Sequence, residues 1–439
     1  MGKNYKKVLV MENNISGSSK KEPPVIYRWI VMVFVSMAMF GNYYIYDSIS
    51  PLADLLASQL NFSDSNIGLL NGIYSLPNIF MVAIGGLIID RIGTRKSTII
   101  FAFFCLSGAV ITASKGDLTT MASGRLIFGL GAESLIVAVT TILARWFKGK
   151  ELSFAFGLNL TIARLGSFAA LNSPSWAKMY YENWQWPLLI SITAGVISVV
   201  AVIIYIGLES NARRKYVLGK EVGQDRIEVK NIFKFNKSFW YITLLCVTFY
   251  SAIFPFQTFA VKFFIEVHDV TREFGGFLSS LLTFFAMIFT PLFGLLADKI
   301  GKRALLMMIG SLCIIPVYLV LNYTTINLLI PMAVMGMSFS LVPAVMWPSV
   351  AYIVNESKLG TAYGIMTMIQ NIGLTGFNFL IGWTNDISGG YSAGMWIFSS
   401  LGFFGLVFAW FLRKTETGPL SHGLEWSMAE RKQKKQLNP

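Results

Sequence analysis

Long apolar runs separated by short polar turns dominate the hydropathy pattern of this chain of 439 residues. A membrane-spanning helix needs about 20 mostly apolar residues, and runs that meet this requirement follow one another along the whole chain. The pattern therefore predicts an all-α membrane protein with twelve transmembrane helices. The predicted spans are 28–49, 65–89, 98–114, 120–144, 152–172, 187–208, 239–265, 274–297, 304–322, 327–354, 359–384 and 392–412.

A near-repeat divides these spans into two halves. The turn after the second span returns after the eighth at an offset of 208 residues. Gly86, Asp90 and Gly93 of the first copy match Gly294, Asp298 and Gly301 of the second, and Arg91 corresponds to Lys299. The repeat predicts two pseudo-symmetric six-helix halves, at residues 28–208 and 239–413. The remaining residues form an N-terminal tail, a linker and a C-terminal tail: 1–27, 209–238 and 414–439.

The repeated turns have a physical interpretation. Gly86 and Gly294 let neighbouring helices approach closely, and the aspartate four residues later can be held by basic side chains and by a helix N-terminus. Such a contact can close in one conformation and open in another, which predicts a conformational gate. The alternative is a tight turn that merely carries basic residues. Two copies at matching positions favour the gate.

Composition and charge agree with a membrane location. Hydrophobic residues make up 54% of the chain and charged residues 13%. The net charge of +13 does not indicate a nucleic-acid partner, because the basic residues outside the spans gather in the tails, the linker and the loops of the same side. Lys115, Lys178 and Arg272 are the exceptions. The positive-inside rule then predicts cytoplasmic termini, and the basic tails are expected to contact anionic lipid headgroups.

The sequence gives little sign of catalysis. It contains no phosphate-binding loop, nucleophile elbow or clustered metal-ligand spacing. The two histidines, His268 and His422, fall in a loop and in the C-terminal tail. We therefore expect no enzyme activity, no cofactor and no metal, and transport would run on gradients.

Two charged residues are predicted near the middle of the membrane. Glu133 lies 12 residues before Arg145 at the end of the fourth span, and Arg164 lies 13 residues after Glu151 at the start of the fifth. At 1.5 Å per residue, both side chains are roughly 18 to 20 Å from the cytoplasmic face. A charge at this depth costs at least about 2.5 kcal/mol on insertion scales, so it faces a partner or a water-filled cavity.

This pair of opposite charges has three interpretations. It can be a buried ion pair that holds the two spans together. It can be a receptor for a zwitterion, in which Glu133 faces an ammonium group and Arg164 holds a carboxylate in its planar fork. It can also alternate between the two, paired when empty and separated around a substrate.

Other charges near the membrane are expected to be structural. Arg125 lies within about two turns of the outer end of the fourth span, where it pairs with Asp47 or braces the wall of a cavity. Lys262 lies near the outer end of the seventh span, so its ammonium group is expected to reach the membrane interface.

The repeated turns resemble the signature of the major facilitator superfamily after its second and eighth spans, and Arg125–Gly131 resembles the fourth-span pattern. The resemblance covers all twelve spans and implies the major facilitator fold. In that fold the first, second, tenth and eleventh spans line the central cavity. The resemblance therefore adds candidates for substrate contact on those spans: Tyr43, Tyr74, Trp347, Gln370 and Asn371.

A more specific resemblance is to the major facilitator superfamily domain-containing protein 1 family. It rests on Gly129–Leu135, Arg145–Leu152, Phe156–Leu158 and Ala163–Ser167, and extends to Tyr46-Asp47, Tyr74–Asn78, Phe254–Phe256, Trp347-Pro348, Leu359–Gly364 and Ile369–Asn371. The resemblance implies a lysosomal dipeptide uniporter that works by alternating access, with Glu133 at the peptide's amino terminus and Arg164 at its carboxylate. It leaves the need for an accessory membrane subunit open. The N-terminal tail lacks the animal family's lysosomal sorting signal, so a bacterial inner membrane is an equal expectation.

Two other functions remain open. The first is a proton-coupled carrier of another small organic ion or an amino acid, with Arg164 as the anion clamp. The first span lacks the Glu-x-x-Glu-Arg motif of proton-coupled peptide symporters, which favours uniport. The second is a membrane receptor without transport, which has no need for opposite charges at mid-membrane.

Overall fold

The computed structural model describes residues 23–147, 151–216, 235–355, 358–419, 421–427 and 430, without the side chain of residue 153. Within these ranges, twelve segments are long and apolar enough to cross a membrane, which confirms the predicted fold class. The first 22 residues of the predicted N-terminal tail, most of the predicted linker and the end of the C-terminal tail lie outside the described residues.

The first six spans are built from α2 (Val25–Asp47), η1 (Ser50–Leu52), α3 (Ala53–Leu60), α4 (Asp64–Gly72), α5 (Ser75–Ile92), α6 (Thr94–Ser114), α7 (Leu118–Phe147), α8 (Leu152–Leu171), α9 (Ser173–Trp176), η2 (Lys178–Tyr180) and α10 (Gln185–Lys215). The last six are α11 (Lys237–His268), α12 (Arg272–Ile300), α13 (Arg303–Tyr323), α14 (Leu329–Ile353), α15 (Leu359–Ser388) and α16 (Ser392–Glu416). Long helices are expected in lipid because each backbone amide bonds within its own segment.

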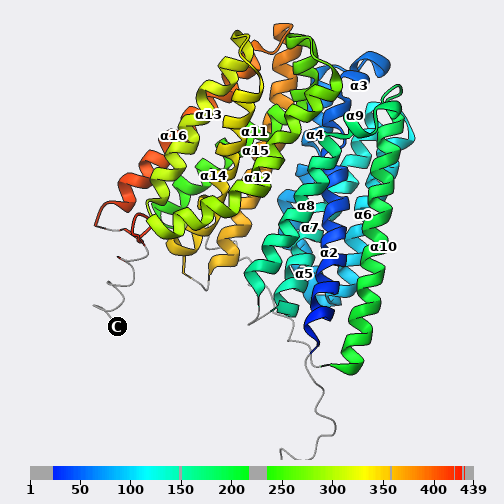
Figure 1. Ribbon diagram of the computed structural model, residues 1–439, viewed down its shortest axis with the longest axis vertical. Coiled ribbons are helices and arrows are strands. Elements are labelled where there is room, and N and C mark those ends of the chain that lie inside the picture. The colour runs from blue at the N-terminus through cyan, green and yellow to red at the C-terminus, as the bar shows by residue number, and fades with distance from the viewer. Residues whose placement is uncertain are drawn as a thin grey trace, which may run out of the picture.

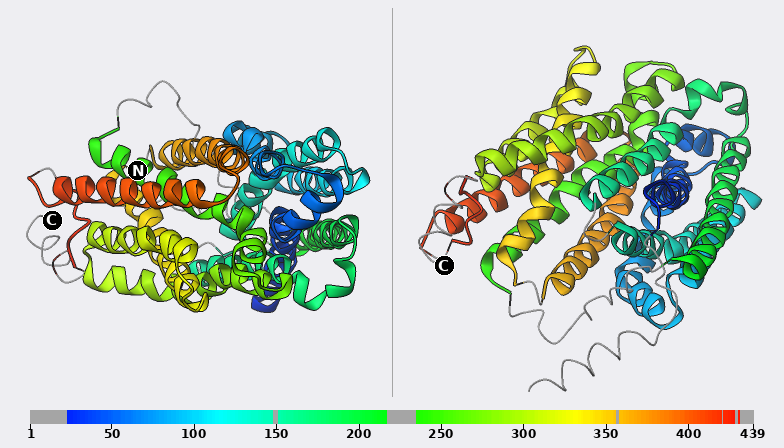
Figure 2. Two further views of the ribbon diagram at one scale, coloured as in Figure 1. Left: turned by 90° about the horizontal axis from the view of Figure 1, so that it is seen from above. Right: turned by 60° about the horizontal axis from the view of Figure 1, so that its bottom comes forward.

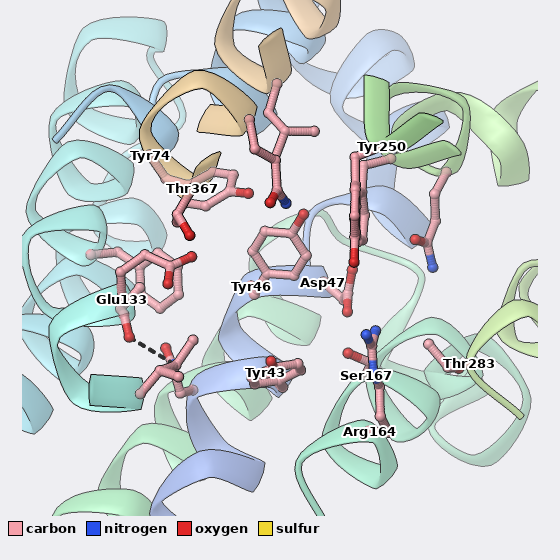
Figure 3. A pocket seen from close by; sticks show the side chains of 18 of the residues that line it. Tyr43, Tyr46, Asp47, Tyr74, Glu133, Arg164, Ser167, Tyr250, Thr283 and Thr367 are labelled. Atoms are coloured by element: carbon pink, nitrogen blue, oxygen red, sulfur yellow. Dashed lines mark hydrogen bonds between the residues drawn. The ribbon is translucent and has the colours of Figure 1, made fainter. Parts of the chain in front are cut away.

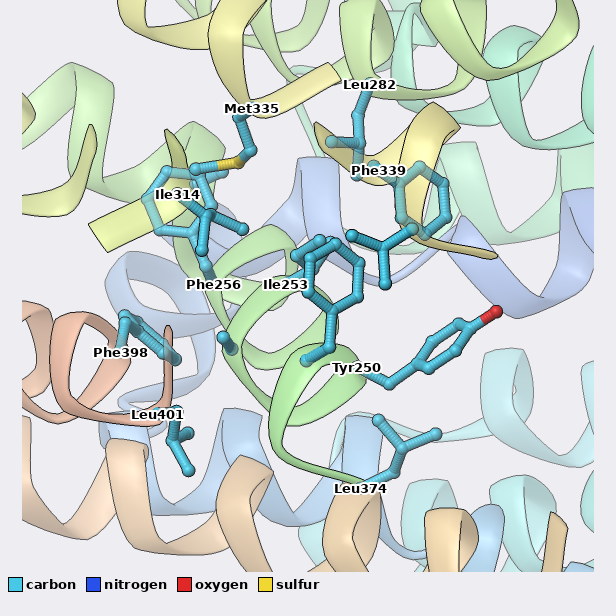
Figure 4. Close-up of a cluster of buried hydrophobic side chains, with 14 of the residues drawn as sticks. Tyr250, Ile253, Phe256, Leu282, Ile314, Met335, Phe339, Leu374, Phe398 and Leu401 are labelled. Atoms are coloured by element: carbon cyan, nitrogen blue, oxygen red, sulfur yellow. The ribbon is translucent and has the colours of Figure 1, made fainter. Parts of the chain in front are cut away.

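The helices form two groups that lie beside each other (Figures 1 and 2). One apolar cluster joins α2, α5, α6, α7, α8 and α10. A second cluster joins α11 to α16, and Figure 4 shows part of it, in which Phe256 lies beside Phe398. Buried side chains of α3 and α4, including Leu56 and Leu70, belong to this second cluster. The first half therefore reaches into the core of the second through α3 and α4.

The two halves meet most closely at one end of the bundle. We call the end where α2 begins and α16 ends the tail side, and the other end the opposite side. The backbones of α4 and α15 touch near the opposite side, because a Cβ atom at Gly68 or Gly382 would collide with a carbonyl oxygen of the other helix. Toward the tail side the two groups of helices diverge (Figure 1).

Polar contacts between the halves also gather at the opposite side. Lys262 Nζ on α11 forms an ion pair with Asp64 at the start of α4, and both side chains are buried. Asn385 Nδ2 donates to the second oxygen of Asp64 at 2.9 Å, and Arg272 Nε donates to Asp54 Oδ2 at 2.9 Å. The expectation that Lys262 extends to the membrane interface is wrong, because Asp64 of the other half holds its ammonium group inside the protein.

The repeated turns are only partly alike in the structure. Gly93 and Gly301 end α5 and α12 with φ of 81° and 69°, a left-handed backbone that favours glycine. Asp298 accepts a hydrogen bond from Arg303. The expectation of close helix approach at Gly294 is wrong for this conformation, because no described atom of a neighbouring helix lies within 4 Å of a Cβ placed there. In the first copy, Gly86 is buried, whereas Asp90 and Arg91 are exposed.

Candidate functional site

A cavity of about 270 Å³ lies between the two halves (Figure 3). Its walls come from α2, α7 and α8 of the first half and from α11, α12, α14 and α15 of the second, with Tyr74 between α4 and α5. The lining is aromatic and polar: Asn42, Tyr43, Tyr46, Asp47, Tyr74, Phe128, Ala132, Glu133, Ile136, Arg164, Ser167, Tyr250, Phe254, Gln257, Thr283, Trp347, Thr367, Gln370 and Leu374.

Both predicted mid-membrane charges line this cavity. Glu133 comes from α7 and Arg164 from α8, and each side chain is partly exposed. In the part of the chain that the structure describes, the two form no ion pair and neither makes a hydrogen bond through its charged group. Figure 3 shows them approaching the cavity from different helices. The interpretation as a locked ion pair therefore does not describe this conformation.

Aromatic rings hold the guanidinium group of Arg164 in position. Its Cζ atom lies 5.1 Å from the ring centroid of Phe339 and 5.8 Å from that of Tyr43. Phe339 belongs to α14 of the second half and Tyr43 to α2 of the first. Cation–π attraction stabilises such contacts by about 0.5 to 2 kcal/mol. Among the described residues, no hydrogen bond or ion pair occupies the donors of the Arg164 guanidinium group.

The neutral candidates divide into residues that line the cavity and one that does not. Tyr43, Tyr74, Trp347 and Gln370 line it, and Trp347 Nε1 donates to the Tyr250 hydroxyl at 2.9 Å. The expectation that Asn371 also lines the cavity is wrong. This side chain is buried and donates to the carbonyl oxygen of Thr367 on its own helix, at 3.0 Å.

Arg125 braces the wall of the cavity. Its Nε, Nη1 and Nη2 atoms donate to the carbonyl oxygens of Leu70, Ile45 and Tyr46, respectively, each at 3.1 Å. These bonds fasten α7 to the end of α2 and to α4, so of the two predicted roles the contacts match bracing. Asp47 makes no ion pair with Arg125 among the described residues and instead lines the cavity.

A smaller polar chamber continues from the cavity toward the opposite side. It shares Tyr46, Asp47, Phe254 and Gln257 with the main cavity and adds Ser50, Asn71, Thr258 and Asn378. The side-chain amide nitrogens of Asn71 and Gln257 are buried, and neither has a hydrogen-bond partner among the described residues. The ion pair between Asp64 and Lys262 lies on elements that also border this chamber, at the end where the halves meet.

Several cavity residues on α11 were not among the residues predicted from the sequence. Tyr250, Phe254 and Gln257 recur at a spacing of three to four residues, which places them on one face of the helix. Gln257 is also a polar side chain within an apolar span, a signal that indicates a cavity or a partner. The apolar composition of the seventh span concealed this face, because its other sides are buried in the core.

Comparisons with known proteins agree with this architecture. A family model described as Major Facilitator Superfamily matches residues 32–275 and 253–430. The lysosomal dipeptide transporter MFSD1 of Danio rerio is 34% identical over 384 residues, covering 83% of this chain and 82% of the relative. The human protein of the same name is 33% identical, covering 83% and 81%. A crystal structure of the nucleoside transporter NupG gives a TM-score of 0.70 at 14% identity and covers 88% of this chain and 99% of that one.

Proposed function

The chain belongs to the major facilitator superfamily and, within it, to the family of the lysosomal dipeptide transporter MFSD1, and from this membership we propose that it transports dipeptides. The central cavity is the proposed substrate site. Glu133 binds the peptide's amino terminus and Arg164 binds its carboxylate. One observation carries this assignment: an acid and a base line the same cavity between the halves, and neither is paired with the other.

The chemistry of the two groups fits the ends of a short peptide. A guanidinium plane binds a carboxylate through two parallel hydrogen bonds, which fixes the orientation of the ligand. A carboxylate binds an ammonium group by charge and hydrogen bonding. Apart from Asp47, the rest of the lining is aromatic or neutral, so peptide side chains meet an adaptable surface. The site is therefore expected to recognise the amino and carboxyl ends of a peptide more strongly than its side chains.

The proposed movement is alternating access of the two halves around this cavity. In the present conformation the halves are joined at the opposite side and diverge at the tail side. If both termini are cytoplasmic, as the positive-inside rule predicts, this is a cytoplasm-open state. Arg164 of the first half contacts Phe339 of the second, so the proposed carboxylate-binding residue lies where the two moving parts meet.

Counterflow in proteoliposomes tests the proposal. Vesicles preloaded with unlabelled dipeptide should accumulate labelled dipeptide without any proton gradient, as expected for a uniporter. Glu133→Gln and Arg164→Ala should each reduce this uptake at least tenfold, because each removes one charge-assisted contact. Glu182→Gln and Arg214→Ala alter exposed charges away from the cavity and serve as matched controls. Uptake by both cavity variants at the rate of the controls would contradict the assigned roles.

Asp47 supports one alternative. It is a second carboxylate in the cavity, and acidic groups within membrane cavities commonly relay protons. The alternative is a proton-coupled carrier of another small organic ion or an amino acid, with Arg164 as the anion clamp. Substrate-driven acidification, followed with a pH dye inside the vesicles, would support it if Asp47→Asn abolished the signal. Ligand binding without any flux would instead indicate a receptor.

A further inference from the structure

The two repeated turns differ in what covers the helix that follows each of them. At the second turn, residues 421–427 of the C-terminal segment lie against the start of α13. Glu425 and Leu424 accept hydrogen bonds through their carbonyl oxygens from the backbone nitrogens of Lys302 and Arg303, both at 3.3 Å. Leu424 is fully buried in the apolar cluster of the second half. The segment is therefore a docked part of the fold.

A carboxylate completes this contact. Glu425 Oε1 accepts a hydrogen bond from the backbone nitrogen of Ala304 at 2.8 Å. The first amides of a helix have no partner within the helix and favour negative charge. Glu425 thus places a carboxyl oxygen as a hydrogen-bond acceptor at the start of α13, just after Gly301.

Among the described residues, the corresponding position in the first half is a groove. At the same offset of 208 residues, Gly93, Arg95 and Lys96 correspond to Gly301, Arg303 and Ala304. A groove of about 550 Å³ lies there, on the tail side of α5, α6 and α10. Its lining residues are Asp90, Ile92, Gly93, Thr94, Arg95, Lys96, Ile99, Ile206 and Arg213.

The groove carries more positive than negative charge. Its lining includes the basic residues Arg95, Lys96 and Arg213 and the acidic residue Asp90, and Arg213 also pairs with Glu209 outside the lining. Arg95 donates to the Ser210 hydroxyl at 2.9 Å, and Arg213 Nε donates to Glu209 at 3.0 Å. These bonds fix the direction of both side chains.

The same groove has an apolar wall. Ile92, Ile99 and Ile206 contribute to its lining, and Ile92 is 41% exposed. The groove lies where α5 and α6 meet at one end of their membrane-spanning lengths. A ligand that joins a negative head to an apolar body would satisfy both kinds of wall, whereas a free anion would use only the basic one.

We propose that this groove binds the phosphate headgroup of an anionic phospholipid, in the place that the Glu425 carboxylate takes in the other half. The phosphate oxygens bind Arg95, Lys96 and Arg213 together with the first amides of α6. The apolar wall contacts the start of the acyl chains. A lipid bound there ties the α5–α6 turn to α10, which stiffens the first half near the turn that is predicted to gate transport.

Thermal unfolding of the purified full-length protein with added short-chain lipid tests this site. The probes are dioctanoyl phosphatidylglycerol, dioctanoyl phosphatidylcholine and inorganic phosphate, each titrated to saturation. Phosphatidylglycerol should raise the unfolding midpoint. Phosphatidylcholine should have little effect, because its headgroup is neutral overall. Inorganic phosphate should bind more weakly than phosphatidylglycerol, since it lacks the apolar contact.

Substitutions assign the effect to the groove. Lys96 is exposed, so Lys96→Gln should fold normally and weaken phosphatidylglycerol binding about fivefold. Lys215→Gln removes an equal charge from the nearby end of α10, outside the groove, and should leave binding unchanged. Equal binding by Lys96→Gln and the parent protein would overturn the site. Equal affinity for inorganic phosphate and phosphatidylglycerol would show that the groove binds a free anion and not a lipid.

Discussion

Replacing Lys262 with methionine should open the opposite side of the protein. In the present structure the Lys262 ammonium group and the Asp64 carboxylate join the two halves, with side-chain exposures of 11% and 7%. Lys262→Met leaves the Asp64 carboxylate buried, with Asn385 still donating to it. Removing one partner of a buried ion pair costs about 3 kcal/mol.

That cost falls mainly on one conformation. When the opposite side opens, Asp64 and Lys262 become hydrated, and an exposed pair contributes little. The variant therefore shifts the equilibrium toward the state open at the opposite side by about 3 kcal/mol, which is about a hundredfold. In the double variant Asp64→Asn/Lys262→Met no charge stays buried, so its shift should be clearly smaller.

Thiol labelling measures this shift. Ser50 is buried in the polar chamber below the opposite side, so Ser50→Cys should react with an impermeant maleimide only when that side opens. The exposed Cys313 is first replaced by serine. Lys262→Met should speed labelling about a hundredfold. Lys178→Met is the control, because its pair with Glu273 has a lysine that is 76% exposed.

Equal labelling rates of Lys262→Met and Lys178→Met would show that the buried ion pair does not hold the opposite side closed. Labelling of the double variant as fast as Lys262→Met would show that an unpaired buried Asp64 carboxylate carries no penalty.

Three further predictions concern the framework. Arg125→Gln should lower the free energy of unfolding by at least about 2 kcal/mol, measured by thermal denaturation, because buried carbonyl oxygens lose their donors. Gly301→Ala should lower the temperature midpoint of unfolding, since φ at this residue is 69° and a Cβ atom there would collide with the backbone of Trp426. Gly294→Ala should leave the midpoint unchanged, because a Cβ atom fits there. Burial raises the pKa of the Glu425 carboxyl. The folded state therefore holds this proton more tightly, and the contribution of Glu425 to stability is full below about pH 4 and is lost as pH rises through its raised pKa. Proteolysis of the C-terminal segment should accelerate over that rise in the parent protein, and Glu425→Gln should lack the dependence.

The sequence predicted the elements of the fold well because the length of an apolar run and the bilayer thickness depend on local composition alone. Counting along two helices also put Glu133 and Arg164 at one depth, and both line the same cavity. Depth does not fix rotation, since neighbouring residues on a helix point about 100° apart. Gln370 therefore lines the cavity while Asn371 does not.

The sequence pattern could not predict which residues contact each other between distant parts of the chain. Lys262 lies near a helix end, where an extended side chain reaches the membrane surface at low cost. Its partner Asp64 is 198 residues away in the other half, so the ion pair depends on how the halves meet. Gly294 repeats Gly86 in sequence, yet no described neighbouring helix packs closely against it, and such packing depends on tertiary structure.

The central claim is that Glu133 and Arg164 bind opposite ends of a dipeptide. Binding affinities of a free dipeptide, its N-acetylated form and its C-amidated form, measured by calorimetry on the parent protein and the two variants, test it most directly. The parent should prefer the free dipeptide over both blocked forms by at least about tenfold. Glu133→Gln should lose the preference against N-acetylation alone, and Arg164→Ala should lose the preference against amidation alone. If Arg164→Ala still discriminates against the amidated peptide as strongly as the parent does, the claim is contradicted.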